Sequence, residues 1–425
     1  MLYMLVILGG AYLLFVLIHL LACKISKSSR SAGESYVSAL GYDLAAPFSE
    51  IGTFIAVITK KWIIHDDSKF HNFIDGFQVV IGGIWAIIVW GIAIFFIINM
   101  LKVENLSTSY KLIDGDVHVL NDLNFEIHDN EIFGIAGESG CGKTTLLKTL
   151  YDIIEFPLEI DKGKVILSGE KNGQSFSYES GNIQKTWWNN ISYVPQAAQS
   201  VLNPIVRLKK QFLDSIPQED RKNETKEQTL ARVAKYLEEL NLSPDILESY
   251  PFQLSGGMRQ RVIIALATFM SPNVVLADEP TTALDVVVQK GILKMLMRLQ
   301  KQLKNTMVIV SHDMGVHYQI TDRMAIMYSG NIIELGPTDA IFNDPIHPYT
   351  KMLVDSLPRV GDKSQKVGIP GRPPALKNPP PGCRFAARCP HATDHCRQEI
   401  PEFIEVKPGR FAACHLLKKE GEKNG

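Results

Sequence analysis

The sequence has no excess of charge of either sign. Its 425 residues include 44 Lys and Arg against 45 Asp and Glu, which leaves a formal net charge of -1 at pH 7. A protein that reads nucleic acid usually carries a clear basic surplus. The composition therefore gives no electrostatic case for nucleic acid as a partner, and the length allows two or three domains.

Two stretches lack charged side chains altogether. Residues 2–22 and 77–101 contain no Asp, Glu, Lys or Arg, and each reaches the roughly 20 residues that a helix needs to cross a bilayer. A buried core helix and a cleaved signal peptide are the alternatives, but both stretches are apolar all round and the first lacks a basic n-region. For the same reason we set aside the loose likeness of residues 20–23, which end at Cys23, to a lipoprotein cleavage site. We expect a membrane anchor.

The topology of this anchor stays open. Two spans would place residues 23–76 outside the cell if the remainder of the chain faces the cytosol. Three basic residues directly follow the first span, however, and such residues favour the cytoplasmic side. A third span over residues 44–64 would resolve the conflict, although three charged side chains fall within it. We therefore expect two or three spans.

A glycine-rich segment follows at residues 137–144, which read Gly-Glu-Ser-Gly-Cys-Gly-Lys-Thr. We predict strands at residues 103–106, 119–127 and 131–136, the last of which leads directly into this segment. Glycines allow consecutive backbone N–H groups to turn toward one anion, Lys143 can reach the β and γ phosphates, and the Thr144 hydroxyl can bind Mg²⁺. A helix that starts near Lys143 adds its positive N-terminal dipole. The predicted nucleotide-phosphate site comprises Gly137, Glu138, Ser139, Gly140, Cys141, Gly142, Lys143, Thr144 and Thr145.

Further motifs follow this loop in order. Residues 254–258 read Leu-Ser-Gly-Gly-Met and should open a helix. The largely apolar residues 273–277 predict a buried parallel strand that ends at the acidic pair Asp278 and Glu279. A second apolar strand, over residues 307–310, precedes His312. Residues 205–250 have the spacing of a mostly helical subdomain. Together with the phosphate loop, these motifs resemble the ATP-binding cassette ATPases.

This resemblance implies roles for the remaining site residues. Asp278 would hold Mg²⁺ through water, Glu279 would polarise the attacking water, and His312 would sense the γ phosphate. Gln196 matches the glutamine that contacts Mg²⁺ and the attacking water, and Tyr110 lies where such ATPases stack an aromatic ring on adenine. The signature residues that would address the nucleotide of a facing subunit are Ser255, Gly256 and Gly257.

Four segments narrow the resemblance to the ATPase subunits of oligopeptide and dipeptide permeases, over about residues 102–417. They are residues 202–204 (Leu-Asn-Pro), 254–261, 278–289 and 347–350 (His-Pro-Tyr-Thr). Met258 after the two signature glycines resembles the D-type subunit. The implied fold is α/β, with a RecA-like parallel sheet, an antiparallel β-subdomain and an α-helical subdomain.

The resemblance also implies an organisation and partners. We expect a membrane-anchoring segment at residues 1–101, a nucleotide-binding domain at 102–335 and a C-terminal extension at 336–425. The chain would be an ATPase, on the cytoplasmic side of the cell membrane, that converts ATP and water to ADP and phosphate and thereby drives import. Its implied partners are two permease subunits, an extracellular substrate-binding protein and a second, related ATPase.

The cargo stays open between oligopeptides or dipeptides and oligosaccharides, because an ATPase sequence does not read the cargo. A half-size exporter is a weaker alternative, since it needs about six long helices ahead of the ATPase. A soluble cassette ATPase of translation or DNA repair would need tandem cassettes or long coiled coils, and it would have no membrane spans.

Cysteine is scarce, with six residues in the chain, yet four of them lie in the Pro-rich tail. Four thiolates suffice for a [4Fe-4S] cluster or a tetrahedral zinc ion, and the pattern is similar to the family's C-terminal extension, which implies [4Fe-4S]. Three histidines between residues 391 and 415 are alternative zinc ligands, and a tail without metal is a further alternative. A reducing cytosol disfavours disulfides. The predicted ligands are Cys383, Cys389, Cys396 and Cys414.

Overall fold

The computed structural model describes residues 99–171, 173–196, 201–217, 221, 224–357 and 368–417. The candidate spans at 2–22 and 44–64 and Cys23 lie outside these residues, as does nearly all of the candidate span at 77–101. Within the described residues, no helix is long and apolar enough to cross a membrane. The end of the 77–101 stretch requires a correction, because residues 99–101 belong to a strand. A buried strand and a span are both apolar, so composition did not mark this boundary.

An antiparallel sheet of four strands forms the first layer, in the order β2-β1-β4-β5. Val103 of the central strand lies opposite Phe125 on one side and Val165 on the other. The strands predicted at 103–106 and 119–127 are confirmed and are longer than predicted. The four strands are β1 (Asn99–Tyr110), β2 (Val117–His128), β4 (Leu158–Lys171) and β5 (Gln174–Glu179).

A second sheet of eight strands carries the phosphate loop, in the order β11-β12-β10-β9-β3-β8-β7-β6. The strands from β9 to β6 are parallel, and β10, β12 and β11 continue the sheet in antiparallel pairing. Every residue of β3, β7 and β8 is buried, as the apolar runs predicted. The strands are β3 (Ile132–Ala136), β6 (Ile191–Val194), β7 (Val274–Asp278), β8 (Thr306–Ser311), β9 (Arg323–Tyr328), β10 (Asn331–Pro337), β11 (Ile404–Lys407) and β12 (Arg410–Ala412).

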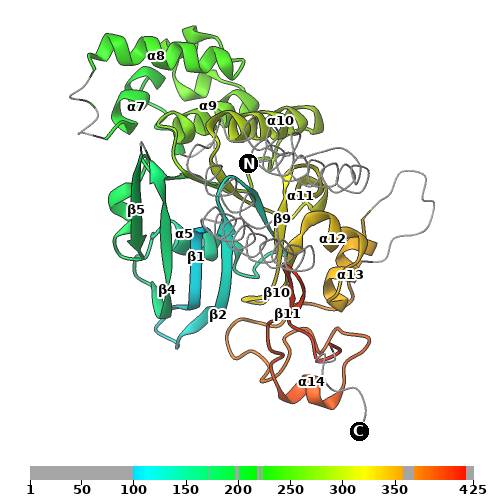
Figure 1. The fold of residues 1–425 in the computed structure, drawn as a ribbon. Helices are drawn as coiled ribbons and strands as arrows, with labels where there is room; N and C mark the ends of the chain where they lie inside the picture. Colours follow the sequence, from blue (N-terminus) through cyan, green and yellow to red (C-terminus); the bar gives the residue numbers. More distant parts are fainter. Residues whose placement is uncertain are drawn as a thin grey trace, which may run out of the picture. The chain divides into compact units, whose positions relative to one another are not determined.

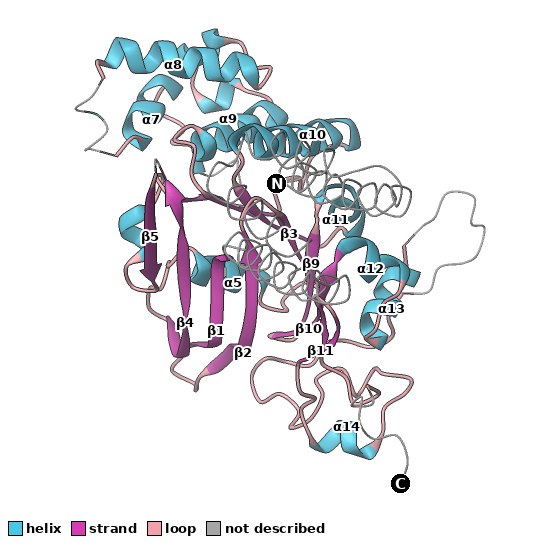
Figure 2. Cartoon of the chain, in the orientation of Figure 1, coloured by secondary structure: helices cyan, strands magenta, loops and turns pink. Residues whose placement is uncertain are grey.

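The helices divide between the sheets and a helical subdomain. Figures 1 and 2 show α7 and α8 at the end of the molecule opposite α14. This confirms the helical subdomain predicted within residues 205–250, and the α/β fold with its two kinds of sheet is confirmed as well. The helices are α5 (Lys143–Leu150), α7 (Leu208–Ser215), α8 (Lys226–Glu239), α9 (Gly256–Thr268), α10 (Val286–Leu303), α11 (Met314–Ile320), α12 (Thr338–Asn343), α13 (Pro348–Asp355) and α14 (Asp394–Gln398).

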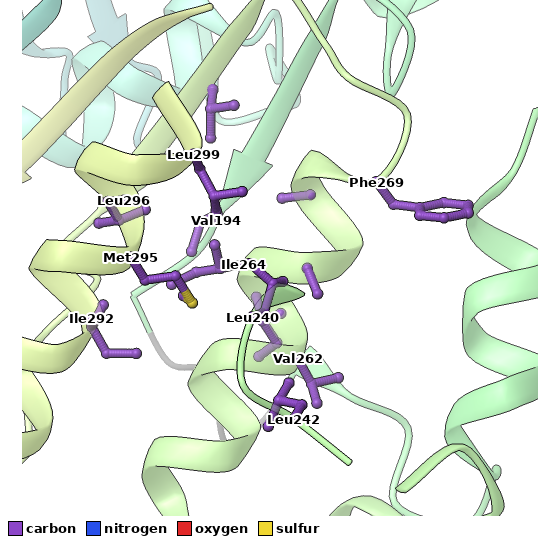
Figure 3. Close-up of a cluster of buried hydrophobic side chains, with 14 of the residues drawn as sticks. Val194, Leu240, Leu242, Val262, Ile264, Phe269, Ile292, Met295, Leu296 and Leu299 are labelled. Atoms are coloured by element: carbon purple, nitrogen blue, oxygen red, sulfur yellow. The ribbon is translucent and has the colours of Figure 1, made fainter. Parts of the chain in front are cut away.

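The largest buried cluster joins the helical subdomain to the parallel sheet. Leu296 of α10 and Ile264 of α9 are fully buried and pack with Val194 at the end of β6 (Figure 3). This core holds α9, which begins within residues 254–258, and α10, which follows Asp278 and Glu279, in place against the sheet. The motifs that these helices carry are therefore positioned by packing.

The C-terminal extension is built onto the main sheet. Strand β12 pairs with β10 and β11 pairs with β12. Arg410 forms an ion pair with Glu334, whose side chain is fully buried, at 3.3 Å. The extension is thus tied by backbone pairing and by a buried charge pair to the sheet that carries the phosphate loop.

Candidate functional site

The phosphate loop connects β3 to α5 and needs glycine for two reasons. Gly142, which precedes α5, has a φ of +105°, in a region that side chains disfavour. A Cβ on Gly137 would lie 2.2 Å from the carbonyl oxygen of Met327 in β9. The loop can therefore take this path over the edge of the sheet only with glycine at these positions.

Lys143 is held by the loop itself. Its ammonium group donates to the carbonyl oxygen of Gly137 at 2.8 Å and to that of Glu138 at 3.0 Å. Cys141 is buried beside it, and burial raises the pKa of its thiol. A neutral, buried thiol is suited to packing within the loop.

A cavity of about 410 Å³ opens at this loop. It brings together most of the predicted nucleotide residues, including Tyr110, whose hydroxyl lies 3.4 Å from that of Thr145. Leu376 of the C-terminal extension also lines it, and no sequence motif pointed to that residue. The lining residues are Tyr110, Val117, Val119, Ser139, Gly140, Gly142, Lys143, Thr144, Thr145, Gln196, Glu279 and Leu376.

Thr144 and Asp278, two of the three residues predicted to bind Mg²⁺, interact with each other. Asp278, at the end of β7, is 1% exposed, and its carboxyl interacts with the Thr144 hydroxyl at the start of α5. The hydroxyl of Tyr193 donates to Asp278 Oδ2 at 3.1 Å. Burial raises the pKa of the Asp278 carboxyl, and the bonds from Thr144 and Tyr193 oppose this. Sequence reasoning missed Tyr193, although it directly precedes the Val-Pro-Gln segment.

Glu279 is fixed from three sides. Gln196 Nε2 donates to Oε2 at 3.0 Å, the Thr282 hydroxyl donates to the same oxygen at 2.8 Å, and His312 Nδ1 lies 3.1 Å from Oε1. Partial burial raises the pKa of Glu279, but the bonds with His312 and Thr282 together lower it by more than burial raises it. The pKa of Glu279 therefore lies below its ordinary value. The carboxylate is therefore ionised at neutral pH and can accept a proton from water. Thr282 was not predicted.

The signature residues lie apart from this group. The Ser255 hydroxyl accepts from the backbone N–H of Met258 at 3.2 Å and caps α9. Gly257 faces α10, where an added Cβ would lie 2.7 Å from a methyl group of Val288. Of the described residues that line the cavity, none comes from residues 254–258. This chain alone therefore presents the phosphate loop and the signature as separate surfaces.

The four tail cysteines are free thiols, and the other three lie near enough to Cys383 to act on its pKa. The backbone N–H of Cys383 donates to the carbonyl of Cys396 at 2.8 Å. Burial, together with the thiolates of Cys414, Cys396 and Cys389, raises the pKa of Cys383 to about 11. In the part of the chain that the structure describes, however, no three His, Cys, Asp or Glu side chains are arranged to hold a metal ion.

Two families match the sequence. The family described as ABC transporter matches residues 120–282. The family described as oligopeptide/dipeptide transporter, C-terminal region, matches residues 333–396. The first match spans the phosphate loop and Glu279, and the second contains three of the four tail cysteines.

Curated relatives match over nearly their whole length. The dipeptide transport ATP-binding protein DppD of Caldanaerobacter subterraneus is 37% identical over 322 residues, which are 75% of this chain and 98% of the relative. The protein of the same description from Lactococcus lactis is 36% identical over 76% of this chain and 93% of its own. The oligopeptide transport ATP-binding protein OppD of Haemophilus influenzae is 35% identical over 75% of this chain and 97% of its own.

Proposed function

This chain belongs to the oligopeptide and dipeptide transport ATPases of the ATP-binding cassette class, and we propose that it hydrolyses ATP to drive the import of peptides across a membrane. The observation that carries the proposal is the position of Glu279. Its carboxylate lines the same cavity as the phosphate loop and is held there by Gln196 and His312. The names of the relatives favour peptides over oligosaccharides as the cargo.

The residues of the cavity suit ATP. Tyr110 would stack on adenine, and the loop N–H groups with Lys143 would bind the phosphates. The hydroxyl of Thr144 and the carboxylate of Asp278 are oxygen donors of the kind that Mg²⁺ prefers, and the two groups interact with each other. Bound Mg²⁺ would neutralise charge on the β and γ phosphates.

Hydrolysis would then depend on a positioned water. Glu279 is ionised and accepts hydrogen bonds from Gln196 and Thr282, so its remaining acceptor sites can orient a water and take its proton. His312, half exposed and bonded to Oε1, would hold the carboxylate and contact the γ phosphate. The chain supplies position and charge, which is most of what phosphoryl transfer requires.

A second subunit would complete the site. Ser255, Gly256 and Gly257 are separate from the cavity of their own chain, and an N-terminus of a helix is suited to hold a phosphate. We propose that they face the nucleotide of a related ATPase, in a complex with two permease subunits and an extracellular substrate-binding protein. The ATPase would lie on the cytoplasmic side of the cell membrane.

We extend the proposal to the organisation of the chain. Residues 1–101 would anchor the subunit in the membrane by two or three spans that end before β1, residues 102–335 would form the nucleotide-binding domain, and residues 336–425 would form the extension. The charge-free stretches at 2–22 and 77–98 support the anchor.

We also propose that Cys383, Cys389, Cys396 and Cys414 hold a [4Fe-4S] cluster, with zinc as the alternative. Four free, neighbouring thiols are the donors that either group takes. A cluster would order a segment that has little apolar core of its own. Iron, sulfide and zinc analysis of anaerobically purified protein tests this, with Cys141→Ser as the control and Cys396→Ser as the variant expected to lose the metal. Metal-free protein that retains all four thiols overturns the proposal.

The test of the main proposal is purification of the tagged chain from detergent-solubilised membranes, followed by identification of stable partners by mass spectrometry. We expect two multi-span permeases and a second cassette ATPase. Transport of labelled peptides by the reconstituted complex should then require ATP. Recovery of copies of this chain alone would contradict the importer, and transport of oligosaccharides but not peptides would contradict the cargo.

A further inference from the structure

The C-terminal extension reaches into the phosphate loop through one ion pair. Arg388 Nη1 lies 2.7 Å from Glu138 Oε2, and Nη2 lies 2.9 Å from Oε1. The two residues are 250 positions apart in the sequence. This bidentate geometry is the strongest form of an arginine–carboxylate contact, and the Arg388 side chain is only 5% exposed. Water therefore screens the guanidinium side of the pair weakly, whereas the Glu138 side chain is 26% exposed.

The guanidinium group of Arg388 is held in place on all sides. Nε donates to the carbonyl oxygen of Pro370 at 2.7 Å, Nη2 donates to that of Ile369 at 3.3 Å, and Nη1 donates to the hydroxyl of Tyr328 at 3.1 Å. Tyr328 belongs to β9, which neighbours the strand that leads into the loop. Arg388 is thus a fixed point to which the loop is attached.

Glu138 connects Arg388 to Lys143, the residue expected to bind the phosphates. Its side chain binds Arg388, its backbone N–H donates to the hydroxyl of Tyr349 at 3.1 Å, and its carbonyl oxygen accepts from Lys143 Nζ at 3.0 Å. A movement of Glu138 therefore changes the position of the Lys143 ammonium. The second position of the phosphate loop connects the extension to the phosphate-binding charge.

An aromatic cluster supports the same contact. The ring of Phe385 lies 5.3 Å from that of Tyr328 and 5.4 Å from that of Tyr349, at angles near perpendicular. Phe385 is 1% exposed, and the backbone N–H of Arg388 donates to its carbonyl at 2.9 Å. The turn that carries Arg388 is therefore anchored against β9 and α13 in one orientation.

We propose that Arg388 is a positioning residue for ATP binding, through which the C-terminal extension sets the conformation of the phosphate loop in its own chain. The inference rests on the proposed nucleotide site. Without Arg388, Glu138 would turn toward solvent, and the loop would have to be ordered by the nucleotide when it binds. The free-energy cost of ordering the loop would then weaken the binding of the nucleotide.

The test measures the dissociation constant of a fluorescent ATP analogue with the full chain in its detergent-solubilised complex. We expect Arg388→Gln and Glu138→Gln each to weaken binding fivefold to twentyfold. The double variant should bind the analogue as tightly as the weaker-binding single variant, because both changes remove the same interaction. Arg388→Lys keeps the charge but loses the bidentate fork, so its dissociation constant should lie between those of the unaltered protein and Arg388→Gln.

Arg410→Gln is the matched control. Arg410 forms a second buried arginine–glutamate pair of the extension, with Glu334 of β10. Within the part of the chain that the structure describes, its hydrogen bonds and ion pairs reach Glu334 and Asp344 and not residues 137–145. Its replacement should lower the melting temperature of the protein and leave the dissociation constant within twofold of the original. A loss of affinity in this control would indicate general destabilisation and would overturn the positioning role.

The outcomes separate the inference from the proposed function. If the unaltered complex does not bind the ATP analogue, the proposed function fails. If it binds, and the variants of Arg388 and Glu138 bind equally well, the positioning role is overturned. Should Arg388→Gln not fold, Arg388→Lys and Glu138→Asp keep both charges but lose the bidentate contact, and unchanged affinity in both would overturn the role equally.

Discussion

His312 Nδ1 and Glu279 Oε1 lie 3.1 Å apart, although the two residues come from the ends of different strands. The other carboxylate oxygen of Glu279 is bonded to Gln196 and Thr282. Glu279 itself has a φ of +46°, a backbone conformation that non-glycine residues seldom adopt. The carboxylate is thus oriented by a strained backbone, by Thr282 in its own turn and by partners on two other segments.

Replacement of Glu279 by Gln should stop turnover and preserve ATP binding. The amide keeps the shape of the side chain but cannot accept a proton from water, so steady-state phosphate release by the assembled complex should fall by about 100-fold or more. The exposed Glu159 of β4 provides the control, since Glu159→Gln should leave the rate unchanged. Undiminished hydrolysis in Glu279→Gln would remove the role assigned to this residue.

Replacement of Tyr193 by Phe should raise the Mg²⁺ concentration that hydrolysis requires. The hydroxyl donates to Asp278 Oδ2 and lowers the pKa of that carboxyl, so its loss raises the pKa and weakens the carboxylate as a partner for Mg²⁺. A lost bond to a buried charge corresponds to about a tenfold change. Magnesium titrations of the ATPase rate check this, with Tyr318→Phe, 55% exposed, as control. An unchanged requirement in Tyr193→Phe would contradict it.

Replacement of Gly257 by Ala should destabilise the packing of α9 on α10. The new Cβ would lie 2.7 Å from a methyl group of Val288, and such overpacking costs about 1–3 kcal/mol. The melting temperature of the full chain should fall, and Gly257→Ala combined with Val288→Ala should recover part of the loss. A double variant no more stable than Gly257→Ala would show that Val288 is not the obstacle.

Replacement of Leu296 by Ala tests the core between the helical subdomain and the sheet. Leu296 is fully buried among α9, α10 and the end of β6 (Figure 3), and such truncations cost about 2–5 kcal/mol. Thermal denaturation should show a clear loss of stability, whereas Ile113→Ala, at a fully exposed position, should show none. Equal melting temperatures would contradict this view of the core.

The buried His347 should make stability fall in mild acid. Burial lowers the pKa of His347 to about 3 from an ordinary value of 6.5, and its Nδ1 accepts from the backbone N–H of Tyr349 at 3.0 Å. Between these pKa values the unfolded chain binds a proton that the folded chain does not, so stability falls as the pH drops below 6.5, by about 2 kcal/mol at pH 5.

Melting temperatures of the full chain between pH 8 and pH 5 measure this effect. His347→Asn keeps a residue that can cap α13 but does not titrate at these pH values. The fall in melting temperature should be smaller in this variant than in the unaltered protein. An identical pH dependence in both proteins would show that His347 does not carry the effect.

Some of the site could be predicted because its chemistry is local. Residues 137–145 form one loop, and the roles of Lys143 and Thr144 follow from their place within it. The buried strand β7 was predicted because parallel strands covered on both faces are apolar, and β3 and β8 were predicted as strands. The start of β1 was missed, since Met100 and Leu101 are as apolar in a sheet as they would be in a span.

Other parts of the site depend on packing between distant segments. No motif assigned a role to Tyr193, Thr282 or Leu376. Tyr193 and Leu376 reach the site only because their strand and loop are held near the phosphate loop, whereas Thr282 is three residues from Glu279 in the same turn. The sequence also could not show that the extension continues the main sheet through β12. Strand pairing of this kind depends on a neighbour that is far away in the chain.

The sequence by itself determined that this protein has a phosphate loop, a signature and an acidic pair in the order of a cassette ATPase, because backbone conformation and residue type within a few positions decide that chemistry. Only the tertiary structure decided that Arg388 lies against Glu138. Long, charged side chains can pair with many partners, and the partner is selected by the cores that bring two segments together.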